Sequence, residues 1–202
     1  MAMKPIEIVI NAKDEASKVF DGLNTKLKAV AAAVATYFGI NAFASVVKGA
    51  ADFEEAMDRV QAATNASGEE LAQLKAAAEA AGATTKFTAI EAASALENLA
   101  KAGLNGKEAI AALPAVMNMA QAGGVSLADA SERLTGVVMG MGLAFTESGR
   151  VADVLAMGAN ASRTSITGLA EAMSYAAPIA KTVGLSLEST TAIVAQFANA
   201  GI

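Results

Sequence analysis

The stretch AGATTKFTAIEAASALENLAKAGL, residues 81–104, shows how this chain folds. Thr88 and Glu91 have the spacing of a capping box, in which a hydroxyl and a carboxylate bind the free amide groups at a helix start. The apolar residues that follow recur at helical spacing on one face: Ile90, Ala93, Leu96 and Ala100. Gly103 stands where a helix ends in the left-handed conformation that glycine adopts without strain. The stretch is therefore predicted to be a short alanine-rich helix with a defined start and end.

The rest of the chain repeats this pattern. Glycines end successive segments, and a turn at residues 162–165 fills the one gap: Gly82, Gly103, Gly124, Gly142, Gly184 and Gly201. Start signals follow them: Ser67 with Glu70, Asn105 with Glu108, Ser126 with Asp129, and Ser186. Helices are predicted at residues 42–65, 68–81, 89–102, 106–121, 127–141, 147–160, 166–183 and 187–200. Because short connections favour antiparallel neighbours, we predict an all-α fold, a multi-helix array of short antiparallel alanine-rich helices.

Residues 88–104 and 165–185 resemble each other. Each is a capped helix followed by a small residue, a glycine and a leucine. The second is longer and contains Pro178, which is predicted to kink or restart its helix. Duplication of a helical hairpin would explain the likeness, and so, nearly as well, would the helix signals that all these segments share.

The composition predicts thin helix contacts. Hydrophobic residues make up 54% of the chain but aromatic residues only 4%, so much of the apolar content is alanine. Alanine favours helices but buries little area, and we expect modest stability. Five methionines are predicted to fill the core, the alternative being an adaptable binding surface: Met117, Met119, Met139, Met141 and Met157. Four phenylalanines are predicted to anchor helices: Phe53, Phe87, Phe145 and Phe197.

The residue content excludes several kinds of reaction centre. The chain has no histidine and no cysteine, which rules out Ser-His-Asp and Cys-His sites. Its net charge of −5 argues against a nonspecific phosphate-binding surface but leaves a local basic patch open. We also predict no specific nucleic-acid binding. Residues 103–107 lack the spacing of a phosphate loop, and residues 140–142 lack a third glycine in register. The adjacent carboxylates Glu54-Glu55 and Glu69-Glu70 fit solvated helix starts. We therefore predict no catalytic residue, no metal, no cofactor and no enzymatic activity.

The first 51 residues differ from the rest. Ile6, Ile8 and Ile10 alternate with other residues as in a short strand, so residues 1–13 are predicted to form an N-terminal strand or extended arm. Residues 14–51 are predicted to be an alanine-rich helical segment, with a break near residues 39–41 and Asn41 as a cap. The uncharged run from Ala29 to Val47 is long enough to span a bilayer, but its alanine and polar content favours a buried bundle or multimer interface.

An ordered series of residues from position 52 to position 202 carries a family resemblance. It includes Phe53-Glu54 with Met57 and Val60, Gly82-Ala83-Thr84-Thr85, Phe87-Thr88-Ala89, Leu99-Ala100-Lys101-Ala102-Gly103, Leu113-Pro114, Asp153, Ser162, Pro178, Gly184 and Asn199-Ala200-Gly201-Ile202. This series resembles the core domain of the tape measure proteins of long-tailed phages. Residues 52–202 are accordingly interpreted as a tape measure core helical domain.

The resemblance implies a structural role in tail length determination, tail assembly and genome ejection. It implies a place in the virion tail lumen, with assembly in the host cytoplasm. The partners that it implies are the tail tube protein, tail assembly chaperones, tail-tip or baseplate proteins, and further copies in a trimer or hexamer, with host membrane contact on ejection. As one continuous helix, the chain would reach only about 300 Å, so we expect it to be the folded N-terminal portion of a longer protein.

Two other functions fit parts of the sequence. The uncharged run Ala29–Val47 suggests a membrane-active helical pore or toxin-like protein. A peptidoglycan-cleaving enzyme is the third reading, because some tape measure proteins carry such domains, but no residue here supplies its catalytic group.

Overall fold

The computed structural model describes residues 40–201, and the chain divides into the units Met1–Ala51 and Asp52–Ile202. The strand or arm predicted at residues 1–13, most of the helical segment predicted at residues 14–51 and most of the uncharged run lie outside the described residues. Of the first unit, only the beginning of helix α2 (Ile40–Thr64) is described. Asn41 lies inside α2, so its prediction as a cap is wrong.

The described residues form eight α-helices and one 3-10 turn, which confirms the all-α prediction. After α2 come α3 (Gly68–Thr84), α4 (Ala89–Lys101), α5 (Gly106–Gly123), α6 (Leu127–Met141), the turn η1 (Phe145–Glu147), α7 (Ser148–Asn160), α8 (Ile166–Thr182) and α9 (Leu187–Ala200). The predicted helix boundaries agree with these to within three residues. Helix α8 runs through Pro178 without a restart, which excludes the restart but not the kink predicted as the alternative.

Most of the predicted caps are present. Thr88 with Glu91 and Asn105 with Glu108 form complete capping boxes. The side chains of three serines accept the backbone amide three residues on: Ser126, Ser165 and Ser186. Ser67 is the exception, because its side chain makes no capping hydrogen bond. Left-handed glycines follow five of the helices as predicted: Gly103, Gly124, Gly142, Gly184 and Gly201.

Gly82 does not end a helix, in contrast to the prediction. Helix α3 continues to Thr84, and Thr85 is the residue after its end. A Cβ atom placed on Gly82 would lie 2.6 Å from the backbone nitrogen of Ala89, the first residue of α4. Gly82 is therefore needed because the start of α4 passes directly against its backbone.

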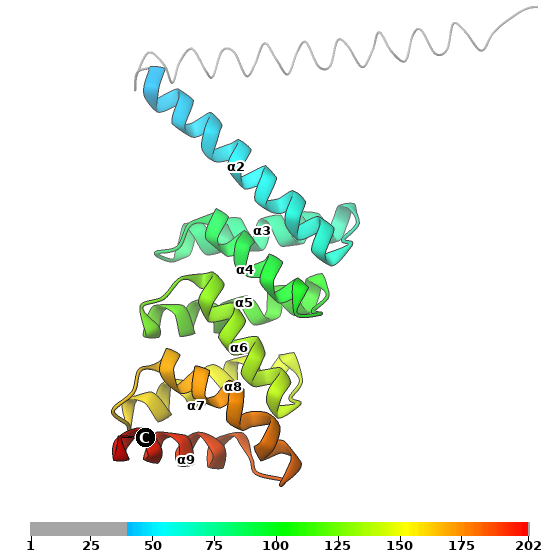
Figure 1. Cartoon of the computed structure of the whole chain (residues 1–202). Coiled ribbons are helices and arrows are strands. Elements are labelled where there is room, and N and C mark those ends of the chain that lie inside the picture. Colours follow the sequence, from blue (N-terminus) through cyan, green and yellow to red (C-terminus); the bar gives the residue numbers. More distant parts are fainter. Residues whose placement is uncertain (1–39, 202) are drawn as a thin grey trace, which may run out of the picture. The chain divides into compact units, whose positions relative to one another are not determined.

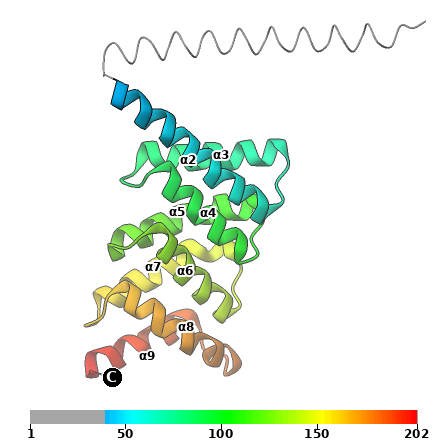
Figure 2. The ribbon, with the colours of Figure 1, turned by 45° about the horizontal axis from the view of Figure 1, so that its top comes forward.

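The helices of the second unit stack in two rows. Each helix from α3 to α7 packs against the next helix and against the next but one, and α8 packs against α9. The even-numbered helices α4, α6 and α8 therefore follow one another in one row, and α3, α5, α7 and α9 follow one another in the other (Figure 1 and Figure 2). Helices α5 and α6 differ in direction by 112°, so this pair crosses obliquely and is not strictly antiparallel.

The even-numbered row has a period of 38 or 39 residues, and α7 and α9 also start 39 positions apart, whereas α5 and α7 start 42 positions apart. The N-cap residues of α4, α6 and α8 are Thr88, Ser126 and Ser165, which lie 38 and 39 positions apart. The left-handed glycines after α4 and α6, Gly103 and Gly142, are 39 positions apart. The likeness between residues 88–104 and 165–185 therefore joins positions two periods apart, with α6 as the intervening copy.

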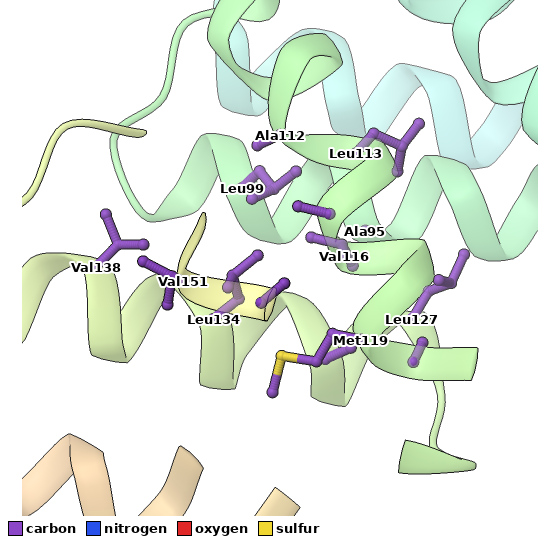
Figure 3. Close-up of a cluster of buried hydrophobic side chains, with 14 of the residues drawn as sticks. Ala95, Leu99, Ala112, Leu113, Val116, Met119, Leu127, Leu134, Val138 and Val151 are labelled. Carbon is purple, nitrogen blue, oxygen red and sulfur yellow. The ribbon is translucent and has the colours of Figure 1, made fainter. Parts of the chain in front are cut away.

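The core is built from small side chains. Nearly half of the buried hydrophobic residues in the described part of the chain are alanines. Larger side chains from α4, α5, α6 and α7 meet between them, as Figure 3 shows for Leu99, Leu113, Leu134 and Val151. Because each helix contributes few large residues, each interface buries a modest apolar area.

The methionine and phenylalanine predictions are confirmed in part. Met119 and Met141 are buried and Met117 packs against the core, but Met139 and Met157 are exposed. Phe87 is buried, and Phe53 and Phe145 pack against the core, whereas Phe197 is exposed. The exposed residues lie on helix faces that no described element covers.

The close approach at Gly82 predicts an unusual effect of alanine. Gly82→Ala should lower the free energy of unfolding by about 1–3 kcal/mol, because the added methyl group meets the backbone of α4. In Gly136→Ala, at the middle of α6, the nearest atom to the added Cβ is 3.8 Å away, and the better helix propensity should raise stability by about 0.5–1 kcal/mol. Urea denaturation of both variants measures this, and shifts of the same sign would contradict the role given to Gly82.

Candidate functional site

The described residues include no cluster of three or more metal-ligating side chains. The buried hydroxyl groups are all used within the fold: Ser131, Thr135 and Ser148 donate to nearby helix carbonyls, Thr190 donates to the Ser186 carbonyl, and Thr191 donates to the sulfur of Met173. Glu54 pairs with Lys75 and Glu55 pairs with Arg59 on the surface. These carboxylates therefore serve helix contacts and do not face a cleft.

A series of ion pairs links helices one period apart. Arg59 donates to Glu97 across 38 positions, from α2 to α4. Arg133 donates to Glu171 from α6 to α8, and Arg150 donates to Glu188 from α7 to α9, each again across 38 positions. Such exposed pairs add little stability. They connect α2 to α4, α6 to α8 and α7 to α9, each through residues 38 positions apart.

Glu97 is the most enclosed carboxylate of this series. Its side chain is 13% exposed and receives hydrogen bonds from two cations, the Lys101 Nζ at 2.6 Å and the Arg59 Nε at 3.2 Å. The bond from Lys101, helped by that from Arg59, holds the pKa of Glu97 below its ordinary value, although partial burial acts in the opposite direction. Glu97 thus ties α2 to α4 as a charged group.

An apolar groove with a volume of about 610 Å³ lies between α8 and α9. We call it the α8–α9 groove. Its walls include Tyr175, Ile179 and Val183 of the α8 side, which are 74%, 68% and 67% exposed. Ile193 and Phe197 of α9 form the opposite wall. No charged residue lines the groove, so it suits an apolar helix better than a polar ligand.

The exposed α8 residues recur at a helical spacing that the sequence shows. Tyr175, Ile179 and Val183 lie four residues apart, which places them on one face of α8. Read from sequence, this stripe looks like the core-facing side of a helix. Only the stack reveals that the described residues leave it uncovered.

The membrane reading finds little support in the described residues. No single helix of the described residues has the length and apolar character needed to cross a bilayer. Helices α5 and α6 together have that length and apolar character, but they are bent by 112° relative to each other. The run Ala29–Val47 falls mostly on residues outside the description.

Comparison with known proteins identifies the relatives of this chain. The model of the phage-related minor tail proteins matches residues 75–202, more than half of the chain. The chain belongs to this family. It is 41% identical over 159 residues to the tape measure protein of Pneumococcus phage Dp-1, and 34% identical over 133 residues to the probable tape measure protein of Escherichia phage P2.

These matches cover 79% and 66% of this chain but only 14% and 16% of the two relatives. The chain therefore spans a small part of the length of the tape measure proteins that it matches. No solved structure matches it. The resemblance drawn from the sequence is confirmed at the level of the family, and the membrane-active alternative is not favoured.

Glu97 predicts a pH-dependent contribution to stability. Its pKa is lower in the folded chain than in the unfolded chain, so its ion pairs stabilise the fold above the ordinary carboxyl pKa and are lost as pH falls through the folded value. We expect Glu97→Gln to lower the free energy of unfolding by roughly 1 kcal/mol at pH 7, and the difference from the parent to shrink as the pH falls below the ordinary carboxyl pKa.

Urea denaturation at pH 7 and pH 3 tests this. Glu171→Gln is the matched control, because Glu171 has a single partner in its ion pair and is 59% exposed. Its effect at pH 7 should stay within about 0.5 kcal/mol. A loss in Glu97→Gln that is equally large at both pH values would contradict the assignment.

Proposed function

We propose that this chain is a helical structural segment of a phage tail tape measure protein. Its family membership and its likeness to two tape measure proteins support this role most directly. The alanine-rich stack of short helices, with its paired surface charges, fits a scaffold. The role is tail length determination, tail assembly and genome ejection as part of a longer protein.

The segment acts in a folded form and does not itself measure length. A continuous helix advances about 1.5 Å per residue, but here each 38-residue or 39-residue hairpin folds back on the previous one. One stacked hairpin therefore adds only about 10 Å, the distance between packed helices. The thin alanine core keeps the folded form weak enough to be rearranged when the protein leaves the tail ahead of the genome.

The location and partners follow from the same role. The chain is placed in the lumen of the virion tail after assembly in the host cytoplasm. There it contacts the tail tube protein, the assembly chaperones and the tail-tip or baseplate proteins, and on ejection it contacts the host membrane. The role is structural and not enzymatic, in keeping with its lack of histidine and cysteine.

Removal of the segment tests the proposed function. In the phage that carries this gene, in-frame deletion of Asp52–Ile202 should abolish tails or give tails of uncontrolled length, because the scaffold of assembly is lost. Electron microscopy of negatively stained lysates measures the length distribution. Normal infectious particles with tails of parental length would overturn the proposal.

A duplicated hairpin distinguishes a folded scaffold from a ruler. Repeating residues 127–165 in frame adds one period of 39 residues. We expect the tails to grow by no more than about 10 Å if the hairpin stacks. Growth by about 58 Å, the length of 39 residues in one continuous helix, would show that the segment itself measures.

The proposed multimer has a direct test. Light scattering after size-exclusion chromatography should give three or six times the chain mass of 20.2 kDa, because cyclic symmetry matches that of a tail. A mass of one chain at all concentrations would contradict self-association of this segment.

A further inference from the structure

We propose that the α8–α9 groove is the docking site for one more helix of the same stack, supplied by a longer tape measure chain. This inference rests on the proposed function, because it places the segment inside a longer protein of that kind. It assigns the groove one occupant: an α-helix whose contacting face carries small apolar side chains.

The residues of α6 that contact α8 have counterparts on α8 one period later. Helix α6 receives α8 at Gly136 and Gly140, where an added Cβ would lie 3.8 Å from Ser174 Cβ and 3.0 Å from Ala177 Cβ. The N-caps of the two helices are 39 positions apart. The residues 39 positions after Gly136 and Gly140 are Tyr175 and Ile179. The positions at which α6 contacts the next helix are thus exposed on α8.

The residues of α7 that contact the next hairpin likewise have counterparts on α9. An added Cβ on Gly158 of α7 would lie 2.8 Å from Leu169 of α8 and 2.6 Å from Thr191 of α9, so this position contacts the next hairpin. The residue one period later is Phe197, which is 52% exposed. Val154 of α7 packs against the core, and its counterpart Ile193 lines the groove. Both walls of the groove therefore consist of positions whose counterparts one period earlier contact the next hairpin. In the described residues no helix packs against them.

The end of α9 directs the chain toward this groove. Helix α5 ends at the left-handed Gly124 (φ 64°, ψ 30°), and α6 then begins three residues on and packs against α4. Helix α9 ends at Gly201 with nearly the same conformation (φ 82°, ψ 23°). A helix that followed it in the same way would pack against α8, the counterpart of α4. The curated relatives are long enough to supply it, since this chain spans only 14% and 16% of them.

The groove also indicates the chemistry of the occupant. Where α6 has glycines, α8 has large side chains that project into the groove, so the incoming helix must carry small residues to approach closely. The residue of α8 equivalent to Arg133 is Ala172. An ion pair like that between Arg133 and Glu171 therefore cannot form between Ala172 and the docked helix. Docking here rests on apolar burial without an ion pair, so screening of charges by salt should not weaken it.

Single cysteines test the proposal, because the natural chain contains none. Phe197→Cys and Ile179→Cys place a thiol inside the groove, and Gln196→Cys places one on an exposed position of α9 outside it. Each is made in the 202-residue chain and in the same chain extended by the residues that follow the matched segment in the Dp-1 tape measure protein. The rate of reaction with a small maleimide reports exposure of each thiol.

We expect the extension to slow labelling at positions 179 and 197 by at least about tenfold and to leave position 196 within about twofold of its rate in the shorter chain. Equal groove labelling in the two chains, including through an extension that does not fold on the stack, would overturn the inference. Protection that appears in the 202-residue chain as its concentration rises would also overturn it, by assigning the groove to a second copy. None of these outcomes depends on tail length, so the proposed function is tested separately.

Discussion

Helices in this protein approach one another across side chains of one methyl group or none, and the stack depends on that closeness. Alanine supplies much of the core, while Gly82 and Gly140 lie where a neighbouring helix comes nearest. Small contacts bury little area for each pair of helices. The fold compensates by giving helices from α3 to α7 two successors to pack against, the next helix and the next but one.

This arrangement makes the structure modular. The N-caps of α4, α6 and α8 recur at 38 or 39 positions, the left-handed glycines after α4 and α6 lie 39 positions apart, and three ion pairs join residues 38 positions apart. Repeat folds of this kind gain stability mainly from contacts between neighbours, and their last unit keeps an interface exposed unless a cap covers it. The exposed apolar wall of Tyr175, Ile179 and Phe197 is such an interface.

Modularity also suits a scaffold. The chain has no histidine or cysteine, and in the described residues the buried hydroxyl groups hydrogen-bond to nearby atoms of the fold. The chain belongs to the phage-related minor tail proteins. It covers only a small share of the length of its tape measure relatives, which is consistent with the proposal that further helices follow in the stack.

The sequence by itself determined where most helices begin and end, because capping boxes such as Thr88 with Glu91 and left-handed glycines such as Gly103 act within a few residues. It also carried the family resemblance, and it excluded Ser-His-Asp and Cys-His sites because the chain has no histidine and no cysteine. It could not separate Gly82, which admits the backbone of α4, from a glycine that ends a helix, nor an exposed Phe197 from a buried anchor. Tertiary structure alone decided the two-row stack, its register and the α8–α9 groove, because these depend on which helix faces meet across 38 or 39 positions and which face meets nothing in the described chain.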